Sequence, residues 1–227
     1  MRIQLIADPE YLLRLSEYFR SINSIELVEA DAEVVFDASF ADPKVKLESL
    51  SKVEWNSGRR GMLITNTLTV TTSLVRQVVG PETGVIGMPI FPRYFERQKL
   101  VEYSMPFGVE NKQDMTTVTN FLSLFGKAGE KIEDAIAGIF PRTLAMIINE
   151  AAFAVQESVA LAEDIDTAMK LGTNYPIGPL AWCDEIGSEC IVASLDALAK
   201  EYGPERYRVA SLLRRHAEAG QPWLARK

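Results

Sequence analysis

Few side chains in this sequence could act as an acid or a base near neutral pH. The 227 residues include a single histidine, His216, and histidine is the commonest acid/base group in that range. It lies in the polar run Arg214-Arg215-His216-Ala217-Glu218, which is typical of an exposed helix face. We therefore expect His216 to be a surface residue, and chemistry that needs a histidine has no other residue to use.

The two cysteines, Cys183 and Cys190, are seven residues apart. On one helix they would be separated by about 10 Å, which is too far for a disulfide. No histidine or third cysteine lies near them in the sequence to complete a zinc site. The sequence therefore predicts two unreactive thiols and no metal site.

Glu102 and several aromatic residues are the other side chains that we consider for a role in catalysis or ligand binding. Glu102 follows the apolar pair Leu100-Val101. It is either a lone base or a carboxylate at a strand end, solvated or paired with Lys99 or Arg97. Packing, in the core or at an interface, is the expected role of the aromatic candidates: Tyr94, Tyr103, Tyr175, Trp55, Trp182 and Trp223.

Short apolar runs separated by helical patterns fill the first 110 residues, which must position these candidates. Pro9 opens the first helical pattern, which continues to Phe19. This alternation favours an α/β layer with a largely parallel sheet. The strands that it predicts are Ile3–Ala7, Ser24–Glu29, Glu33–Asp37, Met62–Thr67, Gly84–Met88 and Lys99–Tyr103.

From about residue 112 onward the apolar spacing is helical. The fold class that we predict is therefore α/β followed by all-α. The boundary between the two parts falls within residues 134–140. The expected helices are Gln113–Phe125, Phe140–Ala162, Glu163–Leu171 with a stop at Gly172, Ile191–Ala199 and Tyr207–Ala217.

Charge and composition exclude several classes of protein. With 47% hydrophobic and 24% charged residues, the chain has the composition of a globular protein rather than a disordered one. Its net charge of −7 leaves no basic footprint for nucleic acid. No apolar run approaches the roughly 20 residues that span a bilayer, and the start is too polar for a signal peptide. We expect a cytoplasmic protein.

The segment from Glu163 to Pro179 resembles the C-terminal domain of 3-hydroxyacyl-CoA dehydrogenases. It matches the family's pattern E-D-I-D-x-A-M-K-x-G-x-x-x-P-x-G-P without a gap. Pro204–Arg208 and Ser211–Arg215 continue the likeness. The resemblance implies a homodimer formed through the C-terminal helices and an acyl-CoA ligand.

The first half resembles the same family more weakly, in the same order of motifs. Ala32–Ala38 is similar to its A-D-L-V-I-E-A strand, Thr65–Thr67 to its S-N-T motif and Lys99–Glu102 to its K-L-V-E segment. The likeness implies a shortened Rossmann-like domain over residues 1–134 and a helical domain over 135–227. A helical excursion that the family carries between its second strand and the A-D-L-V-I-E-A strand is missing.

The turn after the first strand departs from the family, which binds NAD on a G-x-G-x-x-G turn. Here the turn contains Ala7, Asp8 and Pro9, with no glycine. Proline removes an amide donor, and Asp8 places negative charge where the pyrophosphate would lie. An acidic cap that stabilises the helix is the alternative explanation of Asp8. We therefore expect no cofactor, or NAD if the enzyme is active.

The catalytic positions that the resemblance implies are mostly replaced. Met88 stands where the family has its histidine base, while Glu102 keeps the place of the glutamate that orients it. Leu68 replaces a serine, and Pro141 replaces an asparagine. The substrate-binding candidates that remain are Asn66 and Thr67.

Three hypotheses follow from this pattern. The first is a dimeric binding or structural homologue whose NAD-dependent oxidation of 3-hydroxyacyl-CoA is lost or impaired. The second is an active, compact 3-hydroxyacyl-CoA dehydrogenase of fatty-acid metabolism. The third is a hydroxyacid or opine-type dehydrogenase with the same two-domain plan, which shares the objection to the turn without glycine.

Overall fold

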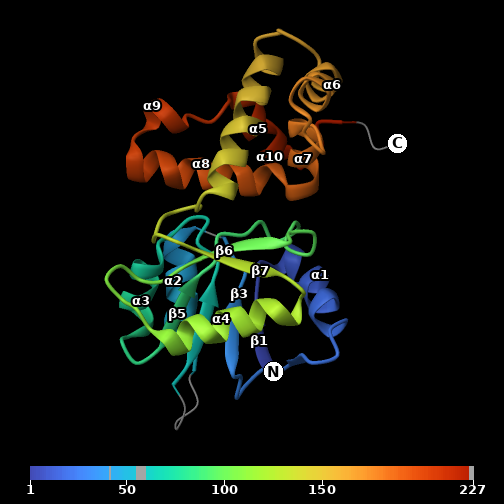
Figure 1. The fold of residues 1–227 in the computed structure, drawn as a ribbon. Helices are drawn as coiled ribbons and strands as arrows, with labels where there is room; N and C mark the ends of the chain where they lie inside the picture. The colour runs from blue at the N-terminus through green and yellow to red at the C-terminus, as the bar shows by residue number, and fades with distance from the viewer. Residues whose placement is uncertain (41, 55–59, 225–227) are drawn as a thin grey trace. The chain divides into compact units, whose positions relative to one another are not determined.

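The structure is a computed structural model that describes residues 1–40, 42–54 and 60–224. Trp55, one of the aromatic candidates, lies outside the described residues. The chain divides into two compact units: the first is Met1–Gly138, and the second begins at Ile139. Figure 1 shows a sheet flanked by helices in the first unit and a group of helices in the second.

A seven-stranded sheet forms the centre of the first unit (Figure 1). The strand order is β2-β1-β3-β4-β5-β6-β7, and neighbours are parallel except for β5 and β6. This confirms the predicted sheet, and the winding direction changes between β1 and β3. The strands are β1 (Arg2–Ile6), β2 (Glu26–Leu27), β3 (Val34–Asp37), β4 (Met62–Thr65), β5 (Gly84–Gly87), β6 (Leu100–Ser104) and β7 (Ala128–Ile132).

Successive side chains of β3 pack against helices on opposite faces of the sheet, as the period of two requires. Phe36 stacks on Phe121 of α4, with ring centroids 5.2 Å apart. Its neighbour Val35 belongs to a cluster with Leu50 of α2 and Val75 of α3. Both faces are therefore covered, which explains the continuous apolar runs in the sequence. The helices of this unit are α1 (Pro9–Arg20), α2 (Pro43–Ser51), α3 (Thr72–Val79) and α4 (Lys112–Leu124).

β7 is a strand that the sequence does not predict. Four of its five residues are exposed: Ala128, Gly129, Glu130 and Lys131. The strand pairs with β6 in parallel register over five residues. Because this edge strand buries little, no apolar alternation marks it in the sequence.

Six helices form the described part of the second unit, which confirms the predicted all-α half. In the described ranges, no helix is both long and apolar enough to cross a membrane. The helices are α5 (Phe140–Gln156), α6 (Ala162–Thr173), α7 (Pro179–Ile186), α8 (Ser188–Tyr202), α9 (Pro204–Tyr207) and α10 (Ser211–Ala219).

The predicted helix over 140–162 is wrong in its second part. α5 ends at Gln156, and Ser158 adopts a left-handed φ of 58° that breaks the helix. The predicted stop at Gly172 is also displaced, since Asn174 ends α6 with a left-handed φ of 58°. Asparagine tolerates this conformation better than most residues with a side chain.

The predicted helix over 207–217 is likewise interrupted. Arg208 is extended between α9 and α10, with a φ of −59° and a ψ of 122°. Asn149 of α5 accounts for the break, because its amide donates to Arg208 O and accepts from Ala210 N, each at 2.9 Å. Both bonds use main-chain groups that the helix would otherwise pair.

Candidate functional site

The carboxyl ends of β1 and β3 meet where the sheet changes its winding direction, and such edges are the usual ligand sites of open α/β sheets. The turn after β1 is closed by contacts with Phe40, which follows β3. The Asp8 carboxylate accepts the Phe40 N–H at 3.1 Å. The ring of Tyr11 lies 5.4 Å from that of Phe40, and both side chains are buried. Pro9 contributes no amide at the start of α1.

A fully buried ion pair lies at the end of β3. Lys46 Nζ donates to Asp37 Oδ2 and also to Ser39 O, the latter at 2.8 Å. The Asp37 carboxylate further accepts from Thr65 Oγ1 at 2.6 Å and from Ser39 N at 3.0 Å. Ser39 Oγ also donates to Asp37 Oδ1 at 2.5 Å and accepts from Lys46 Nζ at 3.4 Å. Six hydrogen bonds therefore compensate two charges that have lost their water.

Asn66, at the end of β4, connects three strand ends. Its side-chain amide donates to Ala38 O at 3.1 Å and to Ile90 O at 3.0 Å. Its carbonyl oxygen accepts from Leu68 N at 3.1 Å and Ile90 N at 3.2 Å. These four bonds use the amide's donors and acceptor, so the structure gives Asn66 a role in positioning the loops. A direct contact with substrate stays a prediction.

Thr67 and Leu68 follow Asn66 and are fully buried. Thr67 O accepts from Ala137 N at 2.8 Å, and Thr67 N donates to Met88 O at 3.4 Å. Within the described residues, the buried Thr67 Oγ1 has no hydrogen-bond partner. A buried hydroxyl without a partner is uncommon in proteins and leaves one polar group for a ligand or water.

The structure brings Glu102 of β6 next to the segment that ends β5. Met88 is fully buried, and Glu102 is 8% exposed. A Cβ atom at Gly138 would lie 2.4 Å from Glu102 Oε2 and 2.6 Å from Pro89 Cγ. The carboxylate therefore lies beside the residue after Met88, and only glycine leaves room for it. A carboxylate can accept a proton at this place, whereas a thioether cannot.

The sequence does not predict two features of this region. Ala137 has a left-handed φ of 60°, a strained conformation that is common at functional sites. The Asp134 carboxylate accepts the main-chain N–H groups of Thr72 at 2.7 Å and Ser73 at 2.8 Å, at the start of α3. No short-range pattern signals either feature, since both depend on the folded chain.

The second unit contains Pro141 and the segment from Glu163 to Pro179 that carries the family resemblance. Pro141 is buried in the first turn of α5. The Asp166 carboxylate accepts Leu180 N and Ala181 N, each at 2.8 Å, at the start of α7. A Cβ atom at Gly178 would lie 2.2 Å from Asp166 Cγ. Asp166 therefore caps α7, and Gly178 leaves the space that the capping carboxylate occupies.

His216 is half-buried, not the surface residue that the sequence predicts. Its ring stacks on that of Trp223, with centroids 3.9 Å apart, and its Nδ1 lies 3.0 Å from Gln221 O. Asp184 holds the same segment by accepting Trp223 N at 2.8 Å. The histidine therefore packs against the segment that follows α10.

Trp182 is half-buried, and the centre of its ring lies 6.1 Å from that of Phe140.

Both cysteines are buried. Burial raises the pKa of the Cys183 thiol to about 12, which matches the predicted unreactive thiols. Tyr103 is buried, whereas Tyr94 and Tyr175 are half-buried. In the part of the chain that the structure describes, no group of three or more His, Cys, Asp or Glu residues could hold a metal ion.

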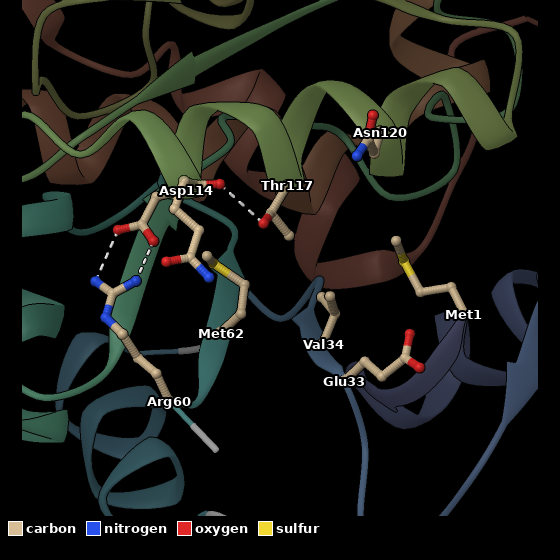
Figure 2. A pocket seen from close by; sticks show the side chains of 9 residues that line it. Met1, Glu33, Val34, Arg60, Met62, Asp114, Thr117 and Asn120 are labelled. Atoms are coloured by element: carbon tan, nitrogen blue, oxygen red, sulfur yellow. Dashed lines mark hydrogen bonds and ion pairs between the residues drawn. The ribbon is translucent and has the colours of Figure 1, made fainter.

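A cavity of about 280 Å³ lies at the amino ends of the central strands, whereas the contacts described above lie at the carboxyl ends (Figure 2). Val34 and Met62 line it from the amino ends of β3 and β4, and Asn120 lines it from α4. Figure 2 shows the Arg60 guanidinium facing the Asp114 carboxylate, to which it donates two hydrogen bonds. One part of the cavity's polar wall is thus an ion pair whose charges are already matched, and the rest consists of Glu33, Gln113, Thr117 and Asn120.

Comparison with known proteins identifies the family. The family model for the 3-hydroxyacyl-CoA dehydrogenase C-terminal domain matches residues 139–225. A relative named probable 3-hydroxybutyryl-CoA dehydrogenase, from Bacillus subtilis, is 31% identical over 100% of this chain and 80% of its own length. The chain belongs to the 3-hydroxyacyl-CoA dehydrogenase family. The resemblance noted in the sequence is thereby confirmed.

Other relatives match in part or in fold. The 3-hydroxyadipyl-CoA dehydrogenase of Escherichia coli is 50% identical over 97 residues, which are 43% of this chain and 20% of that protein. The crystal structure of (S)-3-hydroxybutyryl-CoA dehydrogenase PaaH1 from Ralstonia eutropha has a TM-score of 0.74 at 22% identity. It covers 96% of this chain and 94% of its own, and at that identity it shows the fold alone.

The turn after β1 does not fit a dinucleotide held in the family's ordinary way. The Phe40 amide, which a phosphate could use, is taken by the Asp8 carboxylate. A pyrophosphate would meet that negative charge, and like charges a few ångströms apart repel. Tyr11 and Phe40 fill the adjoining space with buried rings.

Proposed function

We propose that this chain acts on 3-hydroxyacyl-CoA thioesters. The observation that carries this proposal is the identity along the whole chain to a relative named for 3-hydroxybutyryl-CoA. The first candidate function is therefore that of a compact 3-hydroxyacyl-CoA dehydrogenase of fatty-acid metabolism. NAD is the hydride acceptor that the family resemblance implies, and it would need contacts outside the β1–α1 turn.

Glu102 is the proton acceptor that we propose for this function. Its carboxylate lies beside Pro89, and Met88 cannot serve as a base. Gly138 leaves space for the carboxylate at this position. Because the turn does not fit NAD in the ordinary way, we assign no residue of this chain to hydride transfer.

The second candidate function is a binding homologue without NAD chemistry. Two observations favour it: the Asp8 carboxylate occupies the Phe40 amide, and Met88 is fully buried at the position expected for the histidine. In this function the thioester would still bind, and no oxidation would follow.

Two assays separate these candidates. Oxidation of NADH is followed in the presence of acetoacetyl-CoA, with wild-type protein and Glu102→Gln. The matched control is Glu130→Gln, since Glu130 is exposed on β7 directly beside Glu102. Turnover that Glu102→Gln abolishes and Glu130→Gln retains supports the dehydrogenase. Thioester binding by calorimetry without NADH fluorescence enhancement or turnover supports the binding homologue, and no thioester binding overturns both.

We further propose a homodimer that forms through helices of the second unit. Exposed apolar side chains often mark contact surfaces. Sedimentation velocity should give twice the chain mass, and a monomer at every concentration would contradict the proposal. A cytoplasmic location stays a prediction. The exposed apolar residues of this unit include Ile139, Val159, Leu161, Leu171 and Tyr202.

A further inference from the structure

Lys127 lies just before β7 and is 8% exposed, an unusual degree of burial for lysine. Its ammonium donates to three main-chain carbonyl oxygens: Phe95 O at 2.6 Å, Glu96 O at 3.1 Å and Gln98 O at 2.7 Å. An ammonium has three N–H donors, so all of them are used by one short segment of the chain.

These three carbonyls end a helical turn over residues 91–98. Within it, Phe95 N donates to Phe91 O at 3.0 Å, and Gln98 N donates to Tyr94 O at 3.1 Å. The last carbonyls of such a turn have no partner within it, and a cation there is favourable. Lys127 Nζ also lies 4.7 Å from the centre of the Phe95 ring, which adds a cation–π contact.

The turn is the connection between β5 and β6, and so it joins the two parts of the candidate site. Met88 precedes it and Glu102 follows it. The main chain beside Lys127 is also fixed, since Lys127 N donates to Leu122 O of α4 at 3.0 Å, and Ala128 N donates to Lys99 O, just after the turn, at 2.9 Å. The ammonium of Lys127 and the main-chain bond of Ala128 therefore both hold the end of the turn, next to β6.

We propose that Lys127 is a positioning residue for the candidate site, and that its ammonium holds the 91–98 turn, and with it Glu102 relative to Met88, while the ammonium is protonated. A neutral amine has one donor fewer and would point a lone pair at a carbonyl oxygen. The inference rests on the proposed binding of 3-hydroxyacyl-CoA, for which this turn would have to stay in place.

Burial lowers the pKa of Lys127 from 10.5 to about 8. Among the residues that the structure describes, two ionisable groups, Glu96 and Tyr18, face it. Glu96, on the turn, raises the pKa of Lys127 and lies 3.5 Å from Arg14 of α1. Tyr18 of α1 presents its ring 5.6 Å from Nζ, and burial raises the pKa of that phenol. Lys127 therefore loses its proton first as the pH rises.

The test compares Lys127→Arg, which stays charged, with Lys127→Met, which has no charge. Affinity for 3-hydroxybutyryl-CoA is measured by calorimetry between pH 6.5 and 9. We expect the wild-type affinity to fall about threefold or more over this range as one hydrogen bond is lost. Lys127→Arg should lose this pH dependence, and Lys127→Met should bind weakly throughout. Lys112→Met, at an exposed lysine of α4, should match wild type.

Amide hydrogen exchange of residues 93–98 at pH 7 gives a readout that does not depend on the ligand. It should be faster in Lys127→Met than in wild type, while β1 is unchanged. Wild-type exchange in Lys127→Met, or a wild-type pH profile of binding in either variant, would overturn the positioning role. A wild type that binds no thioester at any pH instead overturns the proposed function. If Lys127→Met does not fold, Lys127→Arg and the wild-type profile decide.

Discussion

Replacing Asp166 by alanine removes the carboxylate that holds the start of α7. Asp166 is 4% exposed and accepts the N–H groups of Leu180 and Ala181, each at 2.8 Å. α7 begins at Pro179, which has no N–H, so these two are its first donors. Gly178, at the N-cap, makes no side-chain cap of its own. The cap therefore comes from α6.

The magnitude follows from those two bonds. A hydrogen bond to a charged group contributes about 1.5–3 kcal/mol, and a buried donor left without a partner costs about 1–3 kcal/mol. Since the two bonds are to one group and are not fully additive, we expect Asp166→Ala to lower the free energy of unfolding by about 3–5 kcal/mol. Asp166→Asn keeps one acceptor oxygen and should lose about half as much.

Urea unfolding followed by tryptophan fluorescence measures this change, since Trp182 and Trp223 both report on the second unit. Asp164→Ala is the matched control, because Asp164 is exposed in the first turn of the same helix. It should cost less than about 1 kcal/mol. A loss below that value for Asp166→Ala, or equal losses at the two positions, would refute the capping argument.

Other substitutions and conditions give further predictions. Lys46→Met should lower the free energy of unfolding by about 3–5 kcal/mol in urea, because Asp37 keeps an unpaired buried charge, and adding Asp37→Asn should recover part of the loss. Burial raises the pKa of Cys183 to about 12 from 9, so the free energy of unfolding should fall from pH 9 upward, and a thiol reagent at pH 8 should react only on unfolding. His216→Ala should cost about 1 kcal/mol through the lost Trp223 contact and leave calorimetric thioester affinity within about twofold.

The main elements could be predicted because buried strands and helices carry apolar side chains at regular spacing. β3 and β4 are buried along their whole length, and both appear as apolar runs. β7 has no such run, since its side chains are exposed. The end of α5 was missed for a different reason: a serine, Ser158, takes the left-handed conformation that the sequence signals only with glycine or asparagine.

The candidate site was predictable only where a family resemblance pointed to it. That resemblance singled out Met88 and Glu102 as corresponding to one site, and the structure brings their segments together. The buried Asp37–Lys46 pair and the Lys127 contacts were not predicted. Each depends on charged side chains that in most proteins are exposed, so the sequence alone gives no reason to bury them.

The central claim is that this chain binds 3-hydroxyacyl-CoA thioesters. Isothermal titration of 3-hydroxybutyryl-CoA into the wild-type protein at pH 7 tests it most directly, with free coenzyme A as the control ligand. We predict saturable binding with one site per chain and a dissociation constant below about 1 mM, the upper end of ordinary KM values, and weaker binding of free coenzyme A. Titration to several millimolar without saturable heat, or equal affinity for both ligands, would contradict the claim.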